Sequence, residues 1–185
     1  MSWIQQIDFM ILEWIQSHLQ GAALDLLMPT ITALGNGGWL FILLALVLLL
    51  SKRYRRQGYA LAVSLLLCLL VGNLFLKPLF ARLRPFEVAG LSELLISPPT
   101  DYSFPSGHTM ASFACAGVFW HYRRDFGRWS VVLLILAALI GFSRLYLYVH
   151  FPTDVLCGAL LGLVFAALAV HLCDRAGAYR MQKSR

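Results

Sequence analysis

Long apolar runs are the feature that most constrains how this chain can fold. The two clearest extend from about Gly58 to Phe80 and from about Pro152 to Leu172, and each holds very few charged side chains. Such runs are long enough to approach or cross the hydrocarbon core of a bilayer, which is roughly 30 Å thick. Of the 185 residues, 59% are hydrophobic and 13% are charged, whereas soluble domains average about 25% charged residues. The sequence therefore predicts an integral-membrane protein.

Five segments are predicted to cross the membrane as helices. Their approximate limits are Trp39 to Ser51, Gly58 to Phe80, Ser106 to Tyr122, Trp129 to Tyr146 and Pro152 to Leu172. We find no internal repeat, so one membrane-embedded domain is expected over residues 1–185, with its catalytic bundle in 36–173. The expected fold class is all-α, an integral-membrane bundle of five to six transmembrane helices.

The first 35 residues have a different pattern. Apolar residues recur there at helical spacing, at Trp3, Ile4, Ile7, Met10, Ile11, Trp14 and Ile15. Polar residues such as Asp8 and Glu13 lie between them, which is typical of an amphipathic helix lying in the membrane interface. Leu24 to Leu34 is apolar but short and is interrupted by Pro29. It fits an interfacial or re-entrant piece, or part of a broken sixth span, and the sequence does not decide between them.

The distribution of charge predicts the orientation. The connections 51–57 and 121–128 and the tail 174–185 carry net charges of +4, +2 and +3, and five alternating spans place all three on one face. The opposite face receives the N-terminal stretch, with −3, and the neutral regions 77–105 and 144–154. Positively charged loops stay cytoplasmic. The C-terminal tail is therefore expected in the cytoplasm of a multi-pass cell-membrane protein. The net charge of +6 is explained by topology, and no nucleic-acid partner is expected.

Three clusters of polar residues fall at span ends on the predicted extracytoplasmic face. They are Lys77 with Arg84-Pro85, the segment Pro105-Ser106-Gly107-His108, and Ser143-Arg144 with His150 and Asp154. Charged groups within a membrane are costly and are functional candidates by default. The convergence of three separate segments on one face predicts a functional site there.

The first chemical inference is a phosphate-binding site. Lys77, Arg84 and Arg144 supply three cations, and an arginine can hold phosphate oxygens with two hydrogen bonds. Ser106 and Gly107 open a helix, where free backbone N–H groups favour an anion. The sequence has no carboxylate cluster suited to Mg²⁺ or Zn²⁺. We therefore expect no metal and no other cofactor.

Two histidines complete a possible reaction. His150 and Asp154 are four residues apart, and Pro152 suits the first turn of a helix. This spacing lets Asp154 accept a hydrogen bond from one ring nitrogen while the other nitrogen attacks. His108 comes from another helix and can donate a proton to the leaving alkoxide. These residues predict phosphoryl transfer through a histidine nucleophile.

Each of these residues also has a purely structural interpretation. The basic residues of the first cluster can be interfacial residues that snorkel to the membrane surface, and we assign that role to Arg82. His108 can be a polar residue at a helix end, and His150 with Asp154 can be a stabilising pair at a helix start. The combination of all three clusters favours the functional interpretation.

At these residues the sequence resembles the type-2 phosphatidic acid phosphatase superfamily, whose signature has three parts. The matching residues are Lys77, six residues and Arg84-Pro85; Pro105-Ser106-Gly107-His108; and Ser143-Arg144, five residues, His150, three residues and Asp154. No motif position departs from the pattern, and the motifs span 77–154. The flanking helices are similar to those of the compact bacterial members.

The resemblance implies an all-helical bundle and a phosphohistidine intermediate. It implies that His150 is the nucleophile, Asp154 its orienting partner and His108 the general acid. The implied phosphate-binding residues are Lys77, Arg84, Ser106, Gly107 and Arg144. Vanadate is expected to inhibit, as a mimic of five-coordinate phosphorus.

The sequence thus predicts a phosphatase that acts on a membrane lipid phosphate or diphosphate at the outer face of a bacterial membrane. Undecaprenyl diphosphate is the first expectation. Phosphatidylglycerophosphate and phosphatidic acid are rivals, because the motifs contact the phosphate and not the tail. A phosphotransferase, or a lipid-binding or transport protein with a vestigial site, are alternatives from other classes. The oligomeric state is left open.

Overall fold

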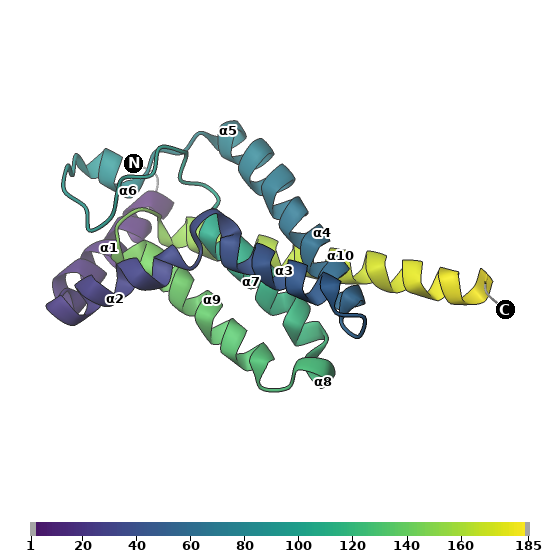
Figure 1. The fold of residues 1–185 in the computed structure, drawn as a ribbon. Helices are drawn as coiled ribbons and strands as arrows, with labels where there is room; N and C mark the ends of the chain where they lie inside the picture. Colours follow the sequence, from purple (N-terminus) through teal and green to yellow (C-terminus); the bar gives the residue numbers. More distant parts are fainter. Residues whose placement is uncertain (1–2, 184–185) are drawn as a thin grey trace.

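The computed structural model describes the backbone of residues 3–183 and the side chains of residues 3–176. All regular secondary structure in this part of the chain is helical, with no β-strand, and residues 90–106 form a long loop. Its elements (Figure 1) are α1 (Trp3–Leu19), α2 (Ala22–Ala33), the 3₁₀ turn η1 (Asn36–Gly38), α3 (Trp39–Leu50), α4 (Arg55–Leu67), the π-helical segment η2 (Cys68–Leu76), α5 (Lys77–Phe80), α6 (Pro85–Ala89), α7 (Gly107–His121), α8 (Arg123–Phe126), α9 (Trp129–Tyr146) and α10 (Pro152–Lys183).

Four helical stretches among the described residues are long and apolar enough to cross a membrane. They are Ala22–Leu50, Arg55–Ala89, Trp129–Tyr146 and Pro152–Ala176. Helix α7 occupies the third predicted span but has only 15 residues. The prediction of a multi-pass, all-helical membrane protein is confirmed. The count of five to six crossings stays a prediction.

The predicted segment from Trp39 to Ser51 coincides with α3. The stretch that is long and apolar enough to cross the membrane also includes η1 and α2 and begins at Ala22. The chain turns at Gly37 and Gly38, whose φ angles are +57° and +68°. Residues with side chains rarely adopt such angles. The apolar segment containing Pro29 is therefore the first half of a broken helix.

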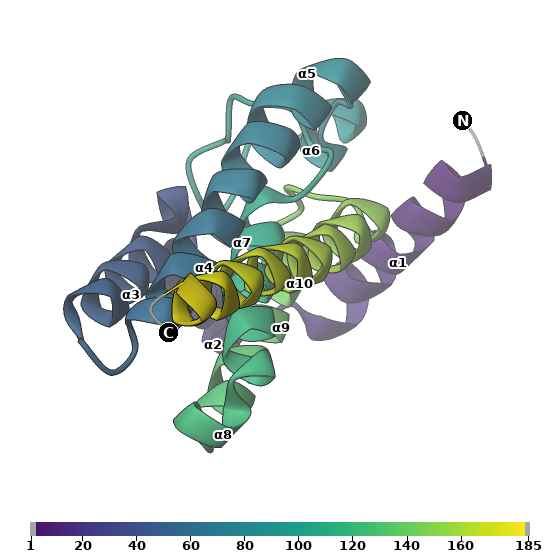
Figure 2. The ribbon, with the colours of Figure 1, turned by 90° about the vertical axis from the view of Figure 1, so that its right-hand side faces the viewer.

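Helix α7 lies at the centre of the bundle and packs against α4, α9 and α10. Figure 2 looks close to the axis of α10 and shows these helices around it. Glycines allow the helices to approach closely: a Cβ atom on Gly162 of α10 would lie 2.3 Å from the carbonyl oxygen of Met110 of α7. The buried core around these helices includes Leu61, Cys115 and Ile140. This packing brings the start of α7 beside the start of α10.

Apolar side chains cover the outside of the bundle as well as its core. Large exposed apolar residues on the long helices include Leu46, Leu66, Ile135, Leu156 and Leu160. Soluble proteins rarely expose contiguous apolar surface of this kind. A lipid environment removes the cost of exposing it to water.

Helix α1 orients one residue against expectation. Asp8 was predicted on the polar face of an interfacial helix, but it is only 1% exposed and points into the protein. Trp3, Met10 and Trp14 of the same helix are exposed. The interfacial position of α1 stays a prediction.

Polar contacts join the basic segments at one end of the molecule. Arg56 forms an ion pair of 2.6 Å with Asp174, and the Tyr122 hydroxyl donates to the same carboxylate at 2.7 Å. Gln57 donates to Asp125 at 2.8 Å. These contacts link the α3–α4 connection, the α8 region and the last part of α10. The predicted gathering of the basic connections at one end is therefore present in the fold.

Candidate active site

A cavity of about 480 Å³ lies at the opposite end from the basic connections. Five of the eight predicted site residues line it, namely Lys77, Arg84, His108, Arg144 and His150. They come from four separate parts of the chain: the end of the second span, the start of α7, the end of α9 and the turn before α10. The fold thus brings the three sequence clusters to one site.

Arg84 is held by its local sequence and by a dense set of contacts. It precedes Pro85 at the first position of α6, and Glu87 accepts its backbone N–H at 2.6 Å, as in a capping box. The residue is 1% exposed, and its side chain donates to the carbonyl oxygens of Asp101 at 2.7 Å and Val149 at 2.6 Å. The guanidinium is therefore fixed at the wall of the cavity.

A carboxylate already pairs with two of the predicted phosphate ligands. Asp101 accepts a hydrogen bond from Lys77 and another from Arg84 at 2.5 Å. Burial alone would raise the pKa of Asp101, but the hydrogen bonds and charges of Lys77 and Arg84 outweigh it and lower the pKa to about 2. Asp101 therefore occupies, as a permanent anion, the place where these cations would meet a phosphate. Asp101 was not among the predicted site residues.

The guanidinium of Arg144 is only partly hydrogen-bonded within the described part of the chain. Its Nη1 atom donates to the Thr32 hydroxyl at 2.6 Å, while its Nε atom is buried and has no hydrogen-bond partner in the described part of the chain. The residue is 2% exposed and lines the cavity. Unpaired buried donors are rare in folded proteins because their desolvation is costly. A ligand oxygen in the cavity would pair with it.

The two ring nitrogens of His150 have different neighbours. Its Nε2 atom lies 3.2 Å from Arg84 Nη1, and its Nδ1 atom lies 3.4 Å from the Ser103 hydroxyl. Burial, followed by the positive charges of Arg84 and Arg144, holds the pKa of His150 well below its usual value. The ring is therefore neutral, and Nε2 accepts a hydrogen bond from Arg84 if Nδ1 carries the proton.

Asp154 is placed by the start of α10. Its Oδ2 atom accepts the backbone N–H of Phe151 at 2.9 Å, the contact expected of an acidic residue three positions into a helix. The same oxygen accepts the Ser103 hydroxyl at 2.5 Å and lies 3.7 Å from His150 Nδ1. The direct hydrogen bond predicted between His150 and Asp154 is therefore replaced by a close approach in which Ser103 contacts both.

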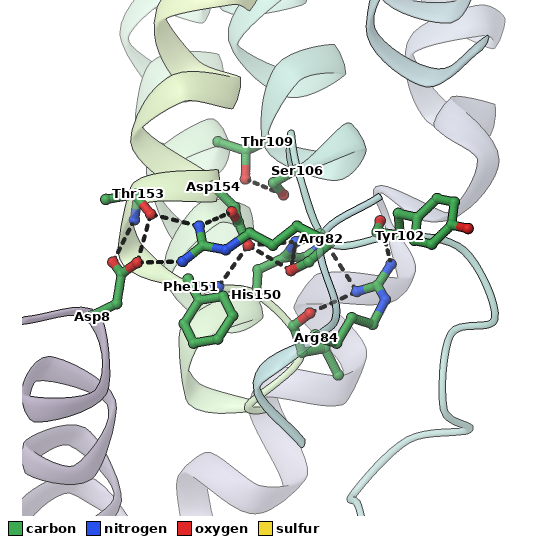
Figure 3. Close-up of polar contacts among 12 residues, drawn as sticks. Asp8, Arg82, Arg84, Tyr102, Ser106, Thr109, His150, Phe151, Thr153 and Asp154 are labelled. Atoms are coloured by element: carbon green, nitrogen blue, oxygen red, sulfur yellow. Dashed lines mark hydrogen bonds and ion pairs between the residues drawn. The ribbon is translucent and has the colours of Figure 1, made fainter. Parts of the chain in front are cut away.

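Arg82 does not have the snorkelling role predicted for it. Its guanidinium pairs with Asp154 at 2.5 Å and with Asp8 at 2.7 Å, between α1 and α10 (Figure 3). Ser103 and Asp8 were also not predicted as residues of the site. The contacts of Arg82, Ser103 and Asp8 join positions 47 to 145 residues apart in the chain. The only signal in the sequence was therefore the position of Arg82, two residues before Arg84.

The start of α7 supplies the remaining predicted residues. Ser106 is fully buried; its hydroxyl lies 2.9 Å from that of Thr109 and its N–H donates to the Asp154 carbonyl at 3.1 Å. Gly107 approaches Asn73 so closely that a Cβ atom would lie 2.9 Å from its side-chain oxygen. His108 Nε2 lies 2.8 Å from Asn36 Oδ1 and faces the cavity. Ser106 thus stabilises the site through its contacts with Thr109 and Asp154.

A second cavity of about 490 Å³ adjoins the first. Lys77, Asp101 and His108 line both cavities. Its other walls are mainly apolar residues of α3, α4 and η2, including Ile42, Leu46, Leu49, Leu65, Leu66 and Leu69. A polar, cationic chamber thus continues into an apolar groove.

The donor set suits an anion more than a metal. Within the part of the chain whose side chains are described, no three His, Cys, Asp or Glu residues come together as potential metal ligands. The cavity wall instead carries three basic side chains and two histidines. Such a wall can hold a phosphoryl group and place an imidazole beside it.

The sequence and the fold of this chain are similar to those of known proteins. The PAP2 superfamily profile matches residues 54–178. An undecaprenyl-diphosphatase of Sulfolobus acidocaldarius is 34% identical over 84% of this chain and 74% of its own length. Phosphatidylglycerophosphatase B of Bacillus subtilis is 28% identical, over 86% of this chain and 80% of its own length. The crystal structure of Aquifex aeolicus LpxE aligns with a TM-score of 0.76 and 27% identity, over 89% of this chain and 95% of that one. This chain therefore belongs to the PAP2 superfamily of membrane phosphatases.

Proposed function

We propose that this protein hydrolyses the phosphate of a membrane lipid phosphate or diphosphate through a phosphohistidine intermediate, without a metal ion. Undecaprenyl diphosphate is the proposed substrate. One observation carries the proposal: the cavity joins three cations and two histidines to an apolar groove between α3 and α4. The phosphate would occupy the cationic chamber, and the hydrocarbon tail would leave through the groove.

In the first step His150 Nε2 attacks the terminal phosphorus. An N–P bond forms, the bond from phosphorus to the leaving oxygen breaks, and His108, protonated in the substrate complex, donates its proton to that oxygen. Lys77, Arg84 and Arg144 hold the oxygens of the transferring group. Phosphoryl transfer depends mainly on such positioning and charge stabilisation.

In the second step water attacks the phosphohistidine. His108, now neutral, takes a proton from the water, the N–P bond breaks, and His150 returns to its starting form with release of orthophosphate. Asp154, with Ser103, fixes the His150 ring through Nδ1 and stabilises its positive charge in the intermediate. Arg84 lies within hydrogen-bond distance of His150 Nε2. When substrate binds, Arg84 must therefore move its hydrogen bond from Nε2 to the phosphate, so that Nε2 can attack.

The substrate assignment draws on the relatives as well as the groove. One relative is an undecaprenyl-diphosphatase and another a phosphatidylglycerophosphatase, so phosphatidylglycerophosphate and phosphatidic acid are the second candidates. We further propose that the site faces the extracytoplasmic side, with the C-terminus in the cytoplasm, because the basic connections meet at the opposite end.

A panel of lipids tests the substrate. Purified protein in detergent micelles is given undecaprenyl diphosphate, farnesyl diphosphate, phosphatidylglycerophosphate and phosphatidic acid, and released phosphate is measured by malachite green. The prenyl diphosphates are expected to show the highest kcat/KM, and turnover should persist in EDTA. Negligible prenyl diphosphate turnover overturns the first choice, and EDTA sensitivity overturns the metal-free scheme. Recovery of a phosphorylated acceptor in place of free phosphate identifies a phosphotransferase.

The nucleophile is tested by substitution. His150→Ala is expected to lower kcat by at least about 10³-fold, as removal of a nucleophile does in other enzymes. His171→Ala is a matched control, since His171 is exposed on α10 at the other end of the molecule. A fully active His150→Ala protein would refute the phosphohistidine scheme. A lipid-binding protein with a vestigial site would show no turnover in the wild type.

A further inference from the structure

Helix α1 contacts the start of α10, at the catalytic end of the bundle, through the buried carboxylate of Asp8. Asp8 is 1% exposed; its Oδ1 accepts the backbone N–H of Thr153 at 3.0 Å, and its Oδ2 accepts the Thr153 hydroxyl at 2.6 Å. Asp8 Oδ2 also pairs with Arg82 at 2.7 Å (Figure 3). Asp8 lies outside residues 54–178, the part of the chain that matches the superfamily profile.

Arg82 is held on several sides at once. Its Nη2 donates to Asp8, while its Nη1 donates to Asp154 Oδ1 at 2.5 Å and to Thr153 Oγ1 at 2.8 Å. The guanidinium carbon lies 4.0 Å from the centre of the Phe151 ring, in a cation–π contact. Each terminal nitrogen of Arg82 thus donates to a carboxylate, Nη1 to Asp154 and Nη2 to Asp8.

These contacts divide the two oxygens of Asp154 between different partners. Oδ1 accepts from Arg82, whereas Oδ2 accepts from Ser103 and Phe151 and is the oxygen nearest His150 Nδ1. A carboxylate paired at both oxygens cannot rotate freely. Asp154 acts on the His150 ring through its charge, 3.7 Å from Nδ1, and through Ser103, which donates to Oδ2 and whose hydroxyl oxygen lies 3.4 Å from Nδ1.

We propose that Arg82 and Asp8 are positioning residues for the catalytic pair. Arg82 fixes the Asp154 carboxylate so that Oδ2 faces His150, and Asp8 fixes Arg82. This inference rests on the proposed phosphohistidine mechanism.

The charges explain why a second carboxylate is present. Arg82 alone would neutralise Asp154 and weaken its stabilisation of a positively charged phosphohistidine ring. Asp8 gives the group of three a net charge of −1, so the ring still faces a negative field. Electrostatic groups fixed before the reaction are among the strongest contributors to catalysis.

The rival role for Arg82 is direct phosphate binding, and the two roles have different kinetic signatures. A phosphate ligand affects KM, whereas a positioning residue affects kcat, since it acts on the nucleophile and not on the bound substrate. We therefore compare Arg82→Met, Arg82→Lys and Asp8→Asn, with farnesyl diphosphate in detergent micelles as substrate. Glu13→Gln is the matched control, because it removes an exposed carboxylate from the same helix.

Arg82→Met is expected to lower kcat by about 10–100-fold, the range seen when outer supports of a site are removed, with KM unchanged within about twofold. Arg82→Lys should recover part of the loss, because it restores the charge without the two-sided hydrogen bonding. Asp8→Asn should lower kcat less than Arg82→Met, and Glu13→Gln should match the wild type. The double variant Asp8→Asn/Arg82→Met should be no slower than Arg82→Met, since both changes break one network.

A spectroscopic measurement tests the inference without turnover. ¹⁵N NMR of histidine-labelled protein should show His150 as the Nδ1–H tautomer in the wild type and as a tautomer mixture in Arg82→Met, with His150→Ala used to assign the signal. An unchanged tautomer, an unchanged kcat, or a raised KM at constant kcat in Arg82→Met overturns the positioning role. A kcat loss that only follows the folded fraction, measured by size exclusion, also overturns it. An inactive wild type whose His150 tautomer still depends on Arg82 refutes the proposed function and leaves the positioning role standing.

Discussion

At the scale of single residues, the carboxylate of Asp101 and an entering phosphate would bind the same basic side chains. Asp101 holds Lys77 and Arg84, and Arg84 also lies against the nucleophilic nitrogen of His150. Among the residues whose side chains are described, Arg144 keeps a buried donor, its Nε atom, unpaired. A phosphate entering the cavity must therefore replace existing contacts as well as form new ones.

Removing the charge of Asp101 should favour the entering anion. We predict that Asp101→Asn lowers the inhibition constant of vanadate by about 3–10-fold, because one negative charge no longer repels it or occupies the cations. The pKa of Asp101 is lowered to about 2, so the carboxylate is charged and the effect should be constant from pH 5 to 8. Vanadate inhibition of phosphate release measures it, with Glu93→Gln as the control in the same loop. Weaker inhibition in Asp101→Asn would show that the carboxylate instead holds the cations in place.

The neutral state of His150 should appear in the pH dependence of stability. Its pKa in the folded protein lies well below the usual value because of burial and neighbouring cations, so below about pH 6.5 the unfolded chain binds a proton that the native protein does not. Stability should therefore fall as pH falls, by at most about 1.4 kcal/mol per pH unit from this residue. Thermal unfolding in detergent at pH 7 and pH 5 should show a smaller decrease for His150→Gln than for the wild type. Equal decreases would contradict a neutral His150.

At the scale of the elements, close contact between α7 and α10 sets the position of the two histidines relative to each other. Each histidine lies at or just before the start of one of these helices. Gly162 and Gly158 allow the backbones to approach, with Cβ positions only 2.3 Å from the Met110 oxygen and 2.7 Å from the Ser106 oxygen. A shift between these helices would separate the reacting groups.

Gly162→Ala is therefore expected to destabilise the protein. Its added methyl group meets backbone atoms that cannot rotate away, and overpacking of this kind costs about 1–3 kcal/mol. A lower melting temperature in detergent and a reduced kcat should result. Gly21→Ala is the control, because nothing lies within 4 Å of a Cβ atom there. A melting temperature equal to that of the wild type would mean that the two helices can separate without penalty.

At the scale of the whole molecule, the two ends have different chemistry. One end joins the basic connections through Asp174 and Asp125, and the other carries the cavity and α1. The long apolar helices run between them (Figure 1). This polarity is what a membrane protein needs to insert with one orientation.

The orientation can be measured with single cysteines. In a variant lacking the four native cysteines, Glu93→Cys should react with a membrane-impermeant maleimide in intact cells. Arg53→Cys should react only after permeabilisation, because it lies in the basic α3–α4 connection. Both positions are exposed. The reverse labelling pattern would place the site in the cytoplasm.

The sequence by itself determined much of this protein. Apolar runs predicted its membrane class, and the ends of α9 and the start of α10 agree with the predicted limits at Tyr146 and Pro152. Local signals explain this success, since hydrophobic length, proline and capping residues act over a few positions. The residues of the three motifs meet at one end because each lies at a span end, which topology alone predicts.

Only the tertiary structure decided how those residues contact one another. The partners of Arg82, Ser103 and Asp101 come from segments remote in sequence. The sequence suggested that Asp8 faces the membrane interface and that Arg82 snorkels, yet the two meet in the interior behind Asp154. Side-chain pairing across helices depends on how the helices pack and turn about their axes, and no local spacing rule contains that information.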